Sequence, residues 1–366
     1  MAEVTVNSTF IVSIYDPYYD LELVISNSIL ACVVALITIT GVLGNSFVIL
    51  LVSLSRQLQT VTNVFVVSLT TSDLIGCSML SLEIVALLNL DGWPLPEWVC
   101  QMTGGVCVIA FIASVAHLAL ISVDRFVLIT RPKTRYMRLY NGRNIIMMVA
   151  FAWLAPLLSI VLPTSLGFGR LGYNAANYFC VFDGTKLQLR MVHIFEEVLF
   201  ATTFSIIISC YVRIYLYVRR QHRNLLQFYD NKPENSQEPQ SSSMRMTIDK
   251  REIEITKNLF MVVCGYFICV LPNSFCVLFE SCYLKYFKFT AVVYSINSCI
   301  NPFIYCFKQP LFRQISLCVF RRRWSDIPKP SPWLQRLVDV KTKKGGTAER
   351  TEISNTVSIS ASVQDV

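Results

Sequence analysis

Seven long apolar stretches, separated by short polar linkers, constrain this chain more than any other feature. They occupy residues 28–53, 62–88, 97–128, 143–165, 191–218, 255–279 and 286–307. A helix needs about 20 apolar residues to cross the hydrocarbon core of a bilayer, and each stretch is long enough. Only 15% of the residues are charged, whereas soluble proteins carry about 25%. The sequence therefore predicts an all-α membrane protein, a bundle of seven transmembrane helices.

The distribution of basic residues predicts how this bundle is oriented. The chain has 32 Lys and Arg residues. With the N-terminus outside, the outer side holds only Arg170, Lys186, Arg190, Lys285 and Lys288. All the others lie on the inner side, which is the bias that membrane proteins show toward the cytoplasm. We therefore expect a multi-pass protein of the plasma membrane with an extracellular N-terminus. Because the basic residues are spread over separate loops, we expect no binding to nucleic acid.

Polar side chains inside the apolar stretches are the first candidates for function, because charged groups are costly in a membrane. Asp73 lies near the middle of the second stretch, and Asn297 and Asn301 share one face of the seventh by their i,i+4 spacing. The full polar set is Asn45, Asp73, Ser114, Asn297, Ser298 and Asn301. One carboxylate with several neutral oxygens suits a small hard cation such as Na⁺. The alternative is a water-filled polar network that joins the helices without an ion.

Short motifs occur in a fixed order on five of these stretches. They are Gly44-Asn45, Ser72-Asp73-Leu74, Asp124-Arg125-Phe126, Trp153 and Asn301-Pro302-Phe303-Ile304-Tyr305. Together they resemble the motifs of rhodopsin-like (class A) G protein-coupled receptors, over residues 28–320. The resemblance implies a receptor that couples an extracellular ligand to a heterotrimeric G protein as helix 6 (residues 255–279) moves away from helix 3 (residues 97–128). It also implies contacts with arrestin, receptor kinases and membrane lipids.

This resemblance, together with composition, divides the chain into four parts. They are an extracellular N-terminal segment at 1–27, the receptor domain at 28–307, an amphipathic eighth helix at 308–320 and a disordered cytoplasmic tail at 321–366. Asn7 begins a sequon and is a glycosylation candidate. Cys318, on the eighth helix, is a palmitoylation candidate. No basic residue precedes the first apolar stretch, so we expect no signal peptide. Polar composition also predicts disorder at residues 231–243.

The resemblance assigns structural roles to cysteines near the outer surface. It pairs Cys100, at the outer end of the third helix, with Cys180 in the second outer loop, where conditions are oxidising. Cys276 and Cys282 are candidates for a second bridge in the third outer loop.

The G-protein switch is assigned in the same way to Asp124, Arg125, Tyr211, Glu252 and Tyr305. In the inactive state, an ion pair between Arg125 and Glu252 would join helices 3 and 6. Two departures from the family pattern leave the activation relay open. Val270 stands where helix 6 normally has tryptophan, and Thr203 stands where helix 5 normally has proline.

The outer halves of the helices would line the ligand pocket. Candidate lining residues are Glu83, Cys107, Val108, Glu196, Asn273, Ser274 and Ser295. Amine receptors have an aspartate where this chain has Cys107, and opsins have the retinal-binding lysine where it has Ser295. The resemblance therefore predicts neither a classical amine receptor nor retinal as cofactor. Glu83 has no basic neighbour, which leaves a basic or amide ligand open. A local likeness to melatonin receptors around Asn63 and Cys210 does not identify the ligand.

The sequence argues against two other classes of protein. A small membrane transporter is the main alternative, but the stretches do not divide into repeats and no pair of them is broken by Gly and Pro. An enzyme is not expected, because no nucleophile–base set accompanies the 3 histidines, and no Cys/His cluster suggests zinc.

Overall fold

The computed structural model describes residues 17–230 and 240–337. Its helices and strands are α1 (Pro17–Leu54), α2 (Val61–Leu88), α3 (Glu97–Thr130), α4 (Lys133–Leu139), α5 (Gly142–Ser165), β1 (Arg170–Asn174), β2 (Phe179–Asp183), α6 (Lys186–Asp230), α7 (Gln240–Leu278), α8 (Glu280–Lys308) and α9 (Pro310–Phe320), followed by the 3₁₀ turn η1 (Trp324–Asp326).

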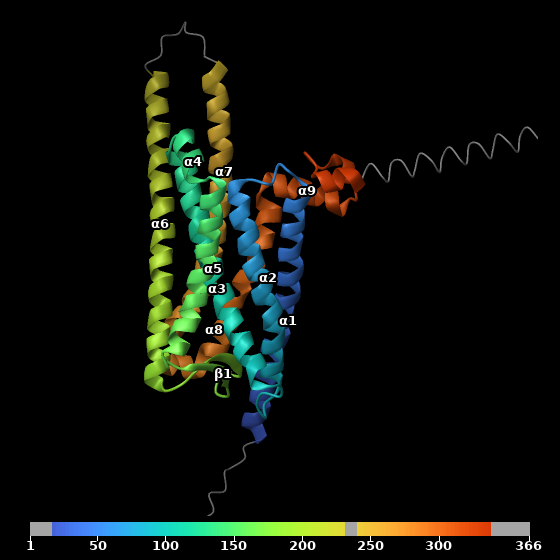
Figure 1. The fold of residues 1–366 in the computed structure, drawn as a ribbon, viewed down its shortest axis with the longest axis vertical. Helices are drawn as coiled ribbons and strands as arrows, with labels where there is room; N and C mark the ends of the chain where they lie inside the picture. The colour runs from blue at the N-terminus through green and yellow to red at the C-terminus, as the bar shows by residue number, and fades with distance from the viewer. Residues whose placement is uncertain (1–16, 231–239, 338–366) are drawn as a thin grey trace, which may run out of the picture.

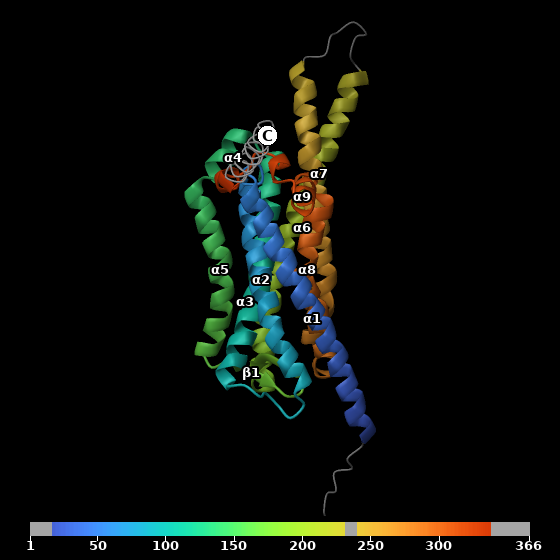
Figure 2. The ribbon, with the colours of Figure 1, turned by 90° about the vertical axis from the view of Figure 1, so that its right-hand side faces the viewer.

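Seven long helices (α1, α2, α3, α5, α6, α7 and α8) run side by side along the molecule (Figures 1 and 2). Helix α3 is central, because it contacts α2, α5, α6 and α7 as well as both strands. Within the described residues, six of the seven are long and apolar enough to cross a membrane. Helix α8 is less apolar because it carries Lys285, Lys288 and several serines and asparagines. The predicted seven-helix membrane bundle is confirmed.

Several helices extend well beyond the apolar stretches. Helix α1 begins at Pro17, and α6 and α7 project together past the rest of the bundle at the end where α9 lies (Figure 1). Residues 240–243, predicted to be disordered, belong to α7, whereas residues 231–239 lie outside the described part. The apolar pattern underestimates the length of these helices, because it marks only the part that crosses the hydrocarbon core of the bilayer.

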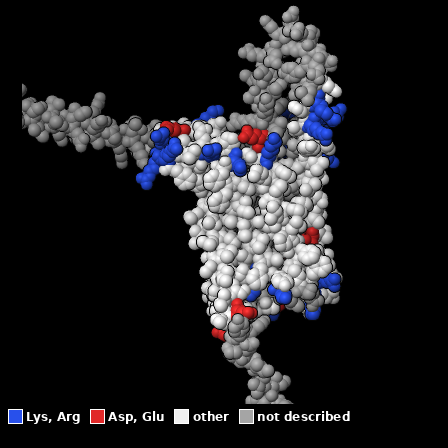
Figure 3. All heavy atoms as spheres, turned by 180° about the vertical axis from the view of Figure 1, so that it is seen from behind, with Lys and Arg blue, Asp and Glu red and all other residues white. Residues whose placement is uncertain are grey.

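The outer surface of the bundle is apolar in the middle and charged at its ends. Figure 3 shows Lys and Arg gathered at both ends of the visible face, with an almost uncharged band between them. Large apolar side chains stand exposed on the long helices, among them Leu36, Ile146, Phe151 and Ile268. Inside the bundle, Phe65, Leu69 and Tyr305 are fully buried. An apolar surface on a well-packed core is what a lipid-facing protein requires.

A two-stranded hairpin closes one end of the bundle, which we call the hairpin end. Strands β1 and β2 pair antiparallel, with Tyr173 opposite Cys180. The opposite end, which carries α9, is the α9 end (Figure 2). The hairpin packs tightly against α3, because a Cβ added to Gly104 would lie 2.5 Å from the Cys180 carbonyl oxygen. Sequence analysis predicted only a loop here, since five-residue strands carry too few alternating positions to be recognised.

The chain after α9 folds back onto α1, and we call residues 324–337 the tail strap. The Ser331 amide donates to the Leu54 carbonyl at 2.8 Å, and the Trp333 indole donates to the Ser53 carbonyl at 3.1 Å. The sequence predicts disorder from residue 321, but the structure places residues 321–337. Their order has a physical reason, because the strap buries its apolar residues Ile327 and Leu334. Residues 338–366 lie outside the described part.

Candidate functional site

Asp124 is the centre of a buried polar cluster at the α9 end of α3. Its Oδ2 accepts a hydrogen bond from the Thr62 hydroxyl at 2.5 Å, and its Oδ1 accepts one from the Tyr136 hydroxyl at 2.8 Å. Thr62 lies in the first turn of α2, and Tyr136 lies on the short helix α4. Burial and the nearby carboxylate raise the pKa of the Tyr136 hydroxyl well above its usual value, so it remains a donor.

Arg125 is held inside the same cluster. Its Nη2 lies 3.5 Å from Asp124 Oδ2 and donates to the Thr62 hydroxyl. The side chain is only 6% exposed. A buried guanidinium requires a carboxylate and further acceptors, because an unpaired charge in such a place is strongly destabilising. Thr62 therefore links both charged residues of the Asp-Arg-Phe motif to α2.

The remaining switch candidates are distributed around this cluster. Tyr305 is fully buried on α8, with its ring 5.9 Å from the ring of Phe312 on α9. Tyr211, on α6, is buried with its ring 5.0 Å from that of Phe260 on α7. The backbone of Glu252 belongs to α7, but its side chain lies outside the described part, so the ion pair with Arg125 stays a prediction.

A second polar cluster lies midway along the bundle, around Asp73. Asn301 on α8 donates to Asp73 Oδ2 at 2.7 Å, and the amide of Asn45 on α1 donates to the Ser298 carbonyl at 2.8 Å. Ser114 on α3 also lies beside the Asp73 carboxylate. The structure thus brings together helices α1, α2, α3 and α8 through residues that the sequence placed in one polar set.

Several oxygens of this cluster have no hydrogen-bond partner among the described residues. They are Asn45 Oδ1, Asp73 Oδ1, Ser114 Oγ, Asn297 Oδ1, Ser298 Oγ and Asn301 Oδ1. Buried polar atoms are normally paired, and a set left unpaired indicates an ion or water between them. All six are oxygen ligands and only one belongs to a carboxylate, which suits a hard monovalent cation.

A third polar network, around His117, is not predicted by the sequence. Both ring nitrogens of His117 form hydrogen bonds: Nδ1 lies 2.6 Å from the Ala113 carbonyl oxygen and Nε2 lies 2.7 Å from Ser68 Oγ. The Trp153 indole of α5 donates to the same Ser68 hydroxyl at 3.0 Å. If Nδ1 carries the proton and donates to the Ala113 carbonyl, then Ser68 donates to Nε2, and every polar group of this network has a hydrogen-bond partner. The Trp153 of the family pattern thus has a defined partner.

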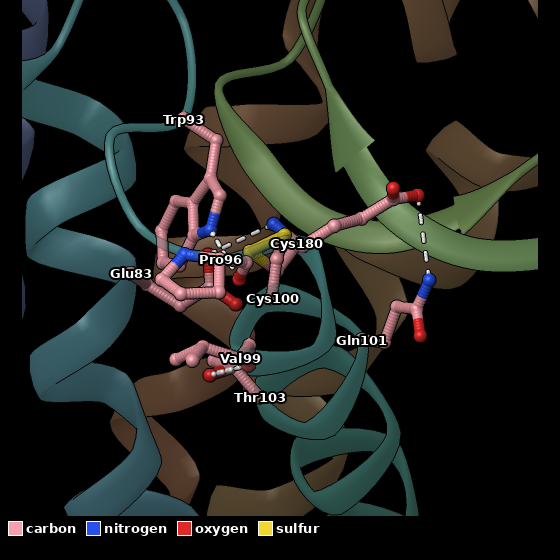
Figure 4. Close-up of a disulfide and its surroundings, with 9 residues drawn as sticks. Glu83, Trp93, Pro96, Val99, Cys100, Gln101, Thr103 and Cys180 are labelled. Carbon is pink, nitrogen blue, oxygen red and sulfur yellow. Dashed lines mark hydrogen bonds between the residues drawn. A yellow bond between two sulfur atoms is a disulfide. The ribbon is translucent and has the colours of Figure 1, made fainter.

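Glu83 lies beneath the disulfide at the hairpin end (Figure 4). Cys100 at the start of α3 is joined to Cys180 on β2, as the resemblance implies. The Cys180 backbone amide donates to Glu83 Oε2 at 3.0 Å. Glu83 is only 2% exposed. One disulfide and one buried hydrogen bond to its carboxyl group therefore tie together α2, α3 and the hairpin.

The other candidate lining residues come from α3, α6, α7 and α8. Asn273 Oδ1 accepts a hydrogen bond from Thr290 at 3.1 Å, which joins α7 to α8. Glu196 faces His193 at 3.8 Å on α6. The remaining four are Cys107, Ser274 and Ser295, which are buried, and Val108, which is half-buried against the small apolar cluster around Phe182. The Ser295 hydroxyl donates to its own helix, at the Ala291 carbonyl.

Comparison with known proteins assigns this geometry to a family. Residues 44–305 match the model of the 7 transmembrane receptor (rhodopsin family). The melatonin receptor type 1B-B of Danio rerio is 28% identical over 306 residues, covering 81% of this chain and 83% of that receptor. The melatonin receptor type 1A of Ovis aries is 27% identical over 315 residues, covering 81% of this chain and 80% of that receptor.

A solved structure agrees with the fold. The crystal structure of squid rhodopsin superposes with a TM-score of 0.70 at 21% identity, covering 82% of this chain and 87% of that one. The family match includes the Asp-Arg-Phe cluster, the polar set around Asp73 and the disulfide, all of which lie within residues 44–305. The chain belongs to the rhodopsin family of seven-transmembrane receptors.

Proposed function

We propose that this protein is a plasma-membrane receptor, and not an enzyme, that couples an extracellular ligand to a heterotrimeric G protein. The observation that carries the proposal is the burial of Arg125 between Asp124 and Thr62 at the α9 end of α3. A guanidinium held by a carboxylate and a hydroxyl at the end of a helix can be released by a small helix movement. We take the α9 end as the G-protein side and place the hairpin end and the N-terminus outside, an orientation that family membership and the distribution of basic residues support.

The proposed switch is a two-state change in helix packing. In the closed state, Asp124 and Thr62 hold Arg125, and Glu252 on α7 supplies a second carboxylate. When α7 moves away from α3, Arg125 turns toward the G protein, and Tyr211 and Tyr305 fill the space that α7 leaves. The guanidinium suits this role because it stays charged and its fork can exchange one acceptor for another.

Sodium is proposed as an allosteric ligand of the receptor. The unpaired oxygens of Asp73, Ser114 and Ser298 fit a hard cation, with Asn45, Asn297 and Asn301 completing the set. A bound Na⁺ would neutralise the Asp73 carboxylate. Asp73 itself keeps its bond from Asn301, so α2 and α8 stay joined. The set therefore stabilises one packing of these helices over another, which is what an allosteric effect requires.

The ligand is proposed to bind between the helices at the hairpin end. Its lining would comprise Glu83, Cys107, Val108, Glu196, Asn273, Ser274 and Ser295. Glu83 already accepts the Cys180 amide through Oε2, which leaves its second oxygen for a donor on a ligand. A ligand with an amide or a basic group suits such an acceptor. Ser295 forms no Schiff base, so retinal is not proposed.

Further partners are proposed from the family. Arrestin and receptor kinases would act on the hydroxyl-rich tail, and inner-leaflet lipids would contact the basic residues Arg321, Arg322 and Arg323. Cys318 lies near the end of α9 and is half-buried, so palmitoylation there stays a proposal. Glycosylation at Asn7 concerns a residue outside the described part.

The test is transducer activation in cells that express the intact chain. A chemically broad ligand panel, with amides and bases represented, is screened against biosensors for each G-protein class. Wild-type protein should activate at least one class, and Arg125→Ala at equal surface level should not. If a ligand binds and is instead carried across the membrane, with every G-protein sensor silent, the receptor proposal fails in favour of a transporter.

A further inference from the structure

Two cysteines at the hairpin end have no role in the proposed function. Cys276 lies in the last turn of α7 and Cys282 in the first turn of α8, and both are free thiols in the structure. Their Sγ atoms are 2.8 Å apart. Non-bonded carbons pack at ~3.5–4.0 Å and sulfur is larger, so two thiols do not rest this closely. The separation is nearer to the ~2.05 Å of a disulfide bond.

The turn between these helices already presents the two sulfurs to each other. Phe279 donates its amide to the Cys276 carbonyl at 3.3 Å, and its own carbonyl accepts the Cys282 amide at 2.9 Å. The next residue, Tyr283, is buried and packs its ring 4.8 Å from the ring of Phe287. A short, hydrogen-bonded turn that is anchored by a buried ring therefore holds the two sulfurs close, so that only a small approach separates them from a bond.

The position of the pair decides its redox environment. The α7–α8 turn lies at the same end of the bundle as β1 and β2 (Figure 1), and that end already holds the Cys100–Cys180 disulfide. The remaining cysteines of α7, Cys264 and Cys269, lie further along the helix toward its middle. Disulfides form on the lumenal and extracellular side of secretory membranes. This step rests on the orientation given under the proposed function.

We propose that Cys276 and Cys282 form a second disulfide, which ties the outer end of α7 to the start of α8. The bond forms by thiol–disulfide exchange with a protein disulfide of the secretory lumen. The thiolate of one cysteine attacks that disulfide and forms a mixed disulfide, and the thiolate of the other displaces the carrier. The two cysteines lose two protons and two electrons, and the carrier leaves as a dithiol.

The bridge gives α7 a fixed outer end. Movement of its inner end away from α3 then becomes a rotation about the α7–α8 turn, with the two helices kept together where they meet. The serine variants Cys276→Ser and Cys282→Ser release this tie without removing a helix. Each replaces sulfur by a smaller polar atom at a helix end, where Cys276 is buried and Cys282 is half-buried, so both variants should reach the cell surface.

The test is disulfide mapping of the full-length receptor purified from the cell surface in the presence of N-ethylmaleimide. Cleavage after Glu280, which lies between the two cysteines in the sequence, separates them unless a disulfide holds them together. We expect a linked peptide pair that reduction separates, and no N-ethylmaleimide on either cysteine. Cys276→Ser should abolish the pair and expose Cys282 to the reagent. Cys264→Ser, in the same helix, should leave the pair intact and serves as the matched control.

The Cys100–Cys180 bridge in the same sample separates the two ways in which the inference can fail. If that bridge is intact while Cys276 and Cys282 both carry N-ethylmaleimide, the second disulfide does not exist and the orientation stands. If all four cysteines carry the reagent, the hairpin end does not face an oxidising compartment, and the proposed orientation fails together with the second disulfide.

Discussion

Replacement of Thr62 by valine should raise the basal signalling of this receptor. The Thr62 hydroxyl donates to Asp124 at 2.5 Å and accepts from Arg125, so both of its bonds involve charged partners. Valine keeps the shape of threonine but makes neither bond. A hydrogen bond to a charged group contributes about 1.5–3 kcal/mol. We count the loss as one such bond, because Asp124 and Arg125 still face each other at 3.5 Å, and it falls mainly on the closed state, in which Arg125 is held.

The size of the effect follows from this loss. A shift of 1.5–3 kcal/mol changes a two-state ratio by about tenfold to a hundredfold. A two-state protein typically populates its minor conformation at about 0.1–10%. A receptor whose active conformation is populated at about 1% would therefore reach about 10% or more. Basal G-protein activation per receptor at the surface should rise accordingly.

The assay compares variants at matched surface number, without any ligand. Thr70→Val is the control, because Thr70 lies buried on the same helix but donates only to carbonyls of its own helix, at Val66 and Val67. Tyr136→Phe is an independent second perturbation, since it removes the other donor to Asp124. Basal activity that rises in neither Thr62→Val nor Tyr136→Phe would refute the idea that this cluster holds the receptor closed.

Three further predictions address other parts of the molecule. Glu83→Ala should lower the melting temperature of the purified receptor, since a buried Cys180 amide without an acceptor costs about 1–3 kcal/mol. Glu83→Gln keeps an acceptor and should retain stability. Equal losses of melting temperature in both variants would mean that the carboxyl group itself matters more than the hydrogen bond. Sodium chloride should stabilise the wild type more than choline chloride of equal concentration, and Asp73→Asn should abolish the difference; an unchanged salt response would argue for water in that cluster. Trp333→Ala should speed hydrogen exchange of backbone amides in the α1–α2 loop, because it removes the hydrogen bond to the Ser53 carbonyl, worth about 0.5–1.5 kcal/mol. Leu337→Ala, at an exposed position of the tail strap, should leave the exchange rate unchanged.

The sequence predicted the helices and the inward-facing polar residues because the bilayer imposes a strict rule. Every backbone group in the apolar core must be paired within the protein, so an apolar stretch of sufficient length is a helix. An ionisable residue such as Asp73 in such a stretch must face the interior. Asp73, Asn301 and Asn45 therefore meet in the structure as the pattern predicts.

The parts outside the bilayer could not be predicted in this way. Tyr136 lies in a short basic segment, Lys133–Leu139, where no periodic pattern points to a helix and nothing indicates its bond to Asp124. The tail strap has many prolines and charges, which are typical of disorder. Its order depends on Ile327 and Leu334, and their burial depends on how α9 and α1 meet. Tertiary contacts of this kind leave no local signal in a single sequence.

The absence of tryptophan on α7 does not leave the bundle without aromatic contacts between α3, α7 and α8. Val270 is buried at the position of that tryptophan, and aromatic contacts are made by other residues. Phe111 on α3 meets Tyr294 on α8 at 4.8 Å in an edge-to-face arrangement, and the side chain of Tyr294 also interacts with that of Tyr266 on α7. A ligand bound at the hairpin end, as proposed above, would therefore act on α7 through rings that belong to α3 and α8. Tyr266 lies about one turn before Val270. The aromatic contact with α7 is therefore closer to the α9 end than a contact made by tryptophan at position 270 would be. We therefore expect activation to pass through contacts between α3, α8 and Tyr266.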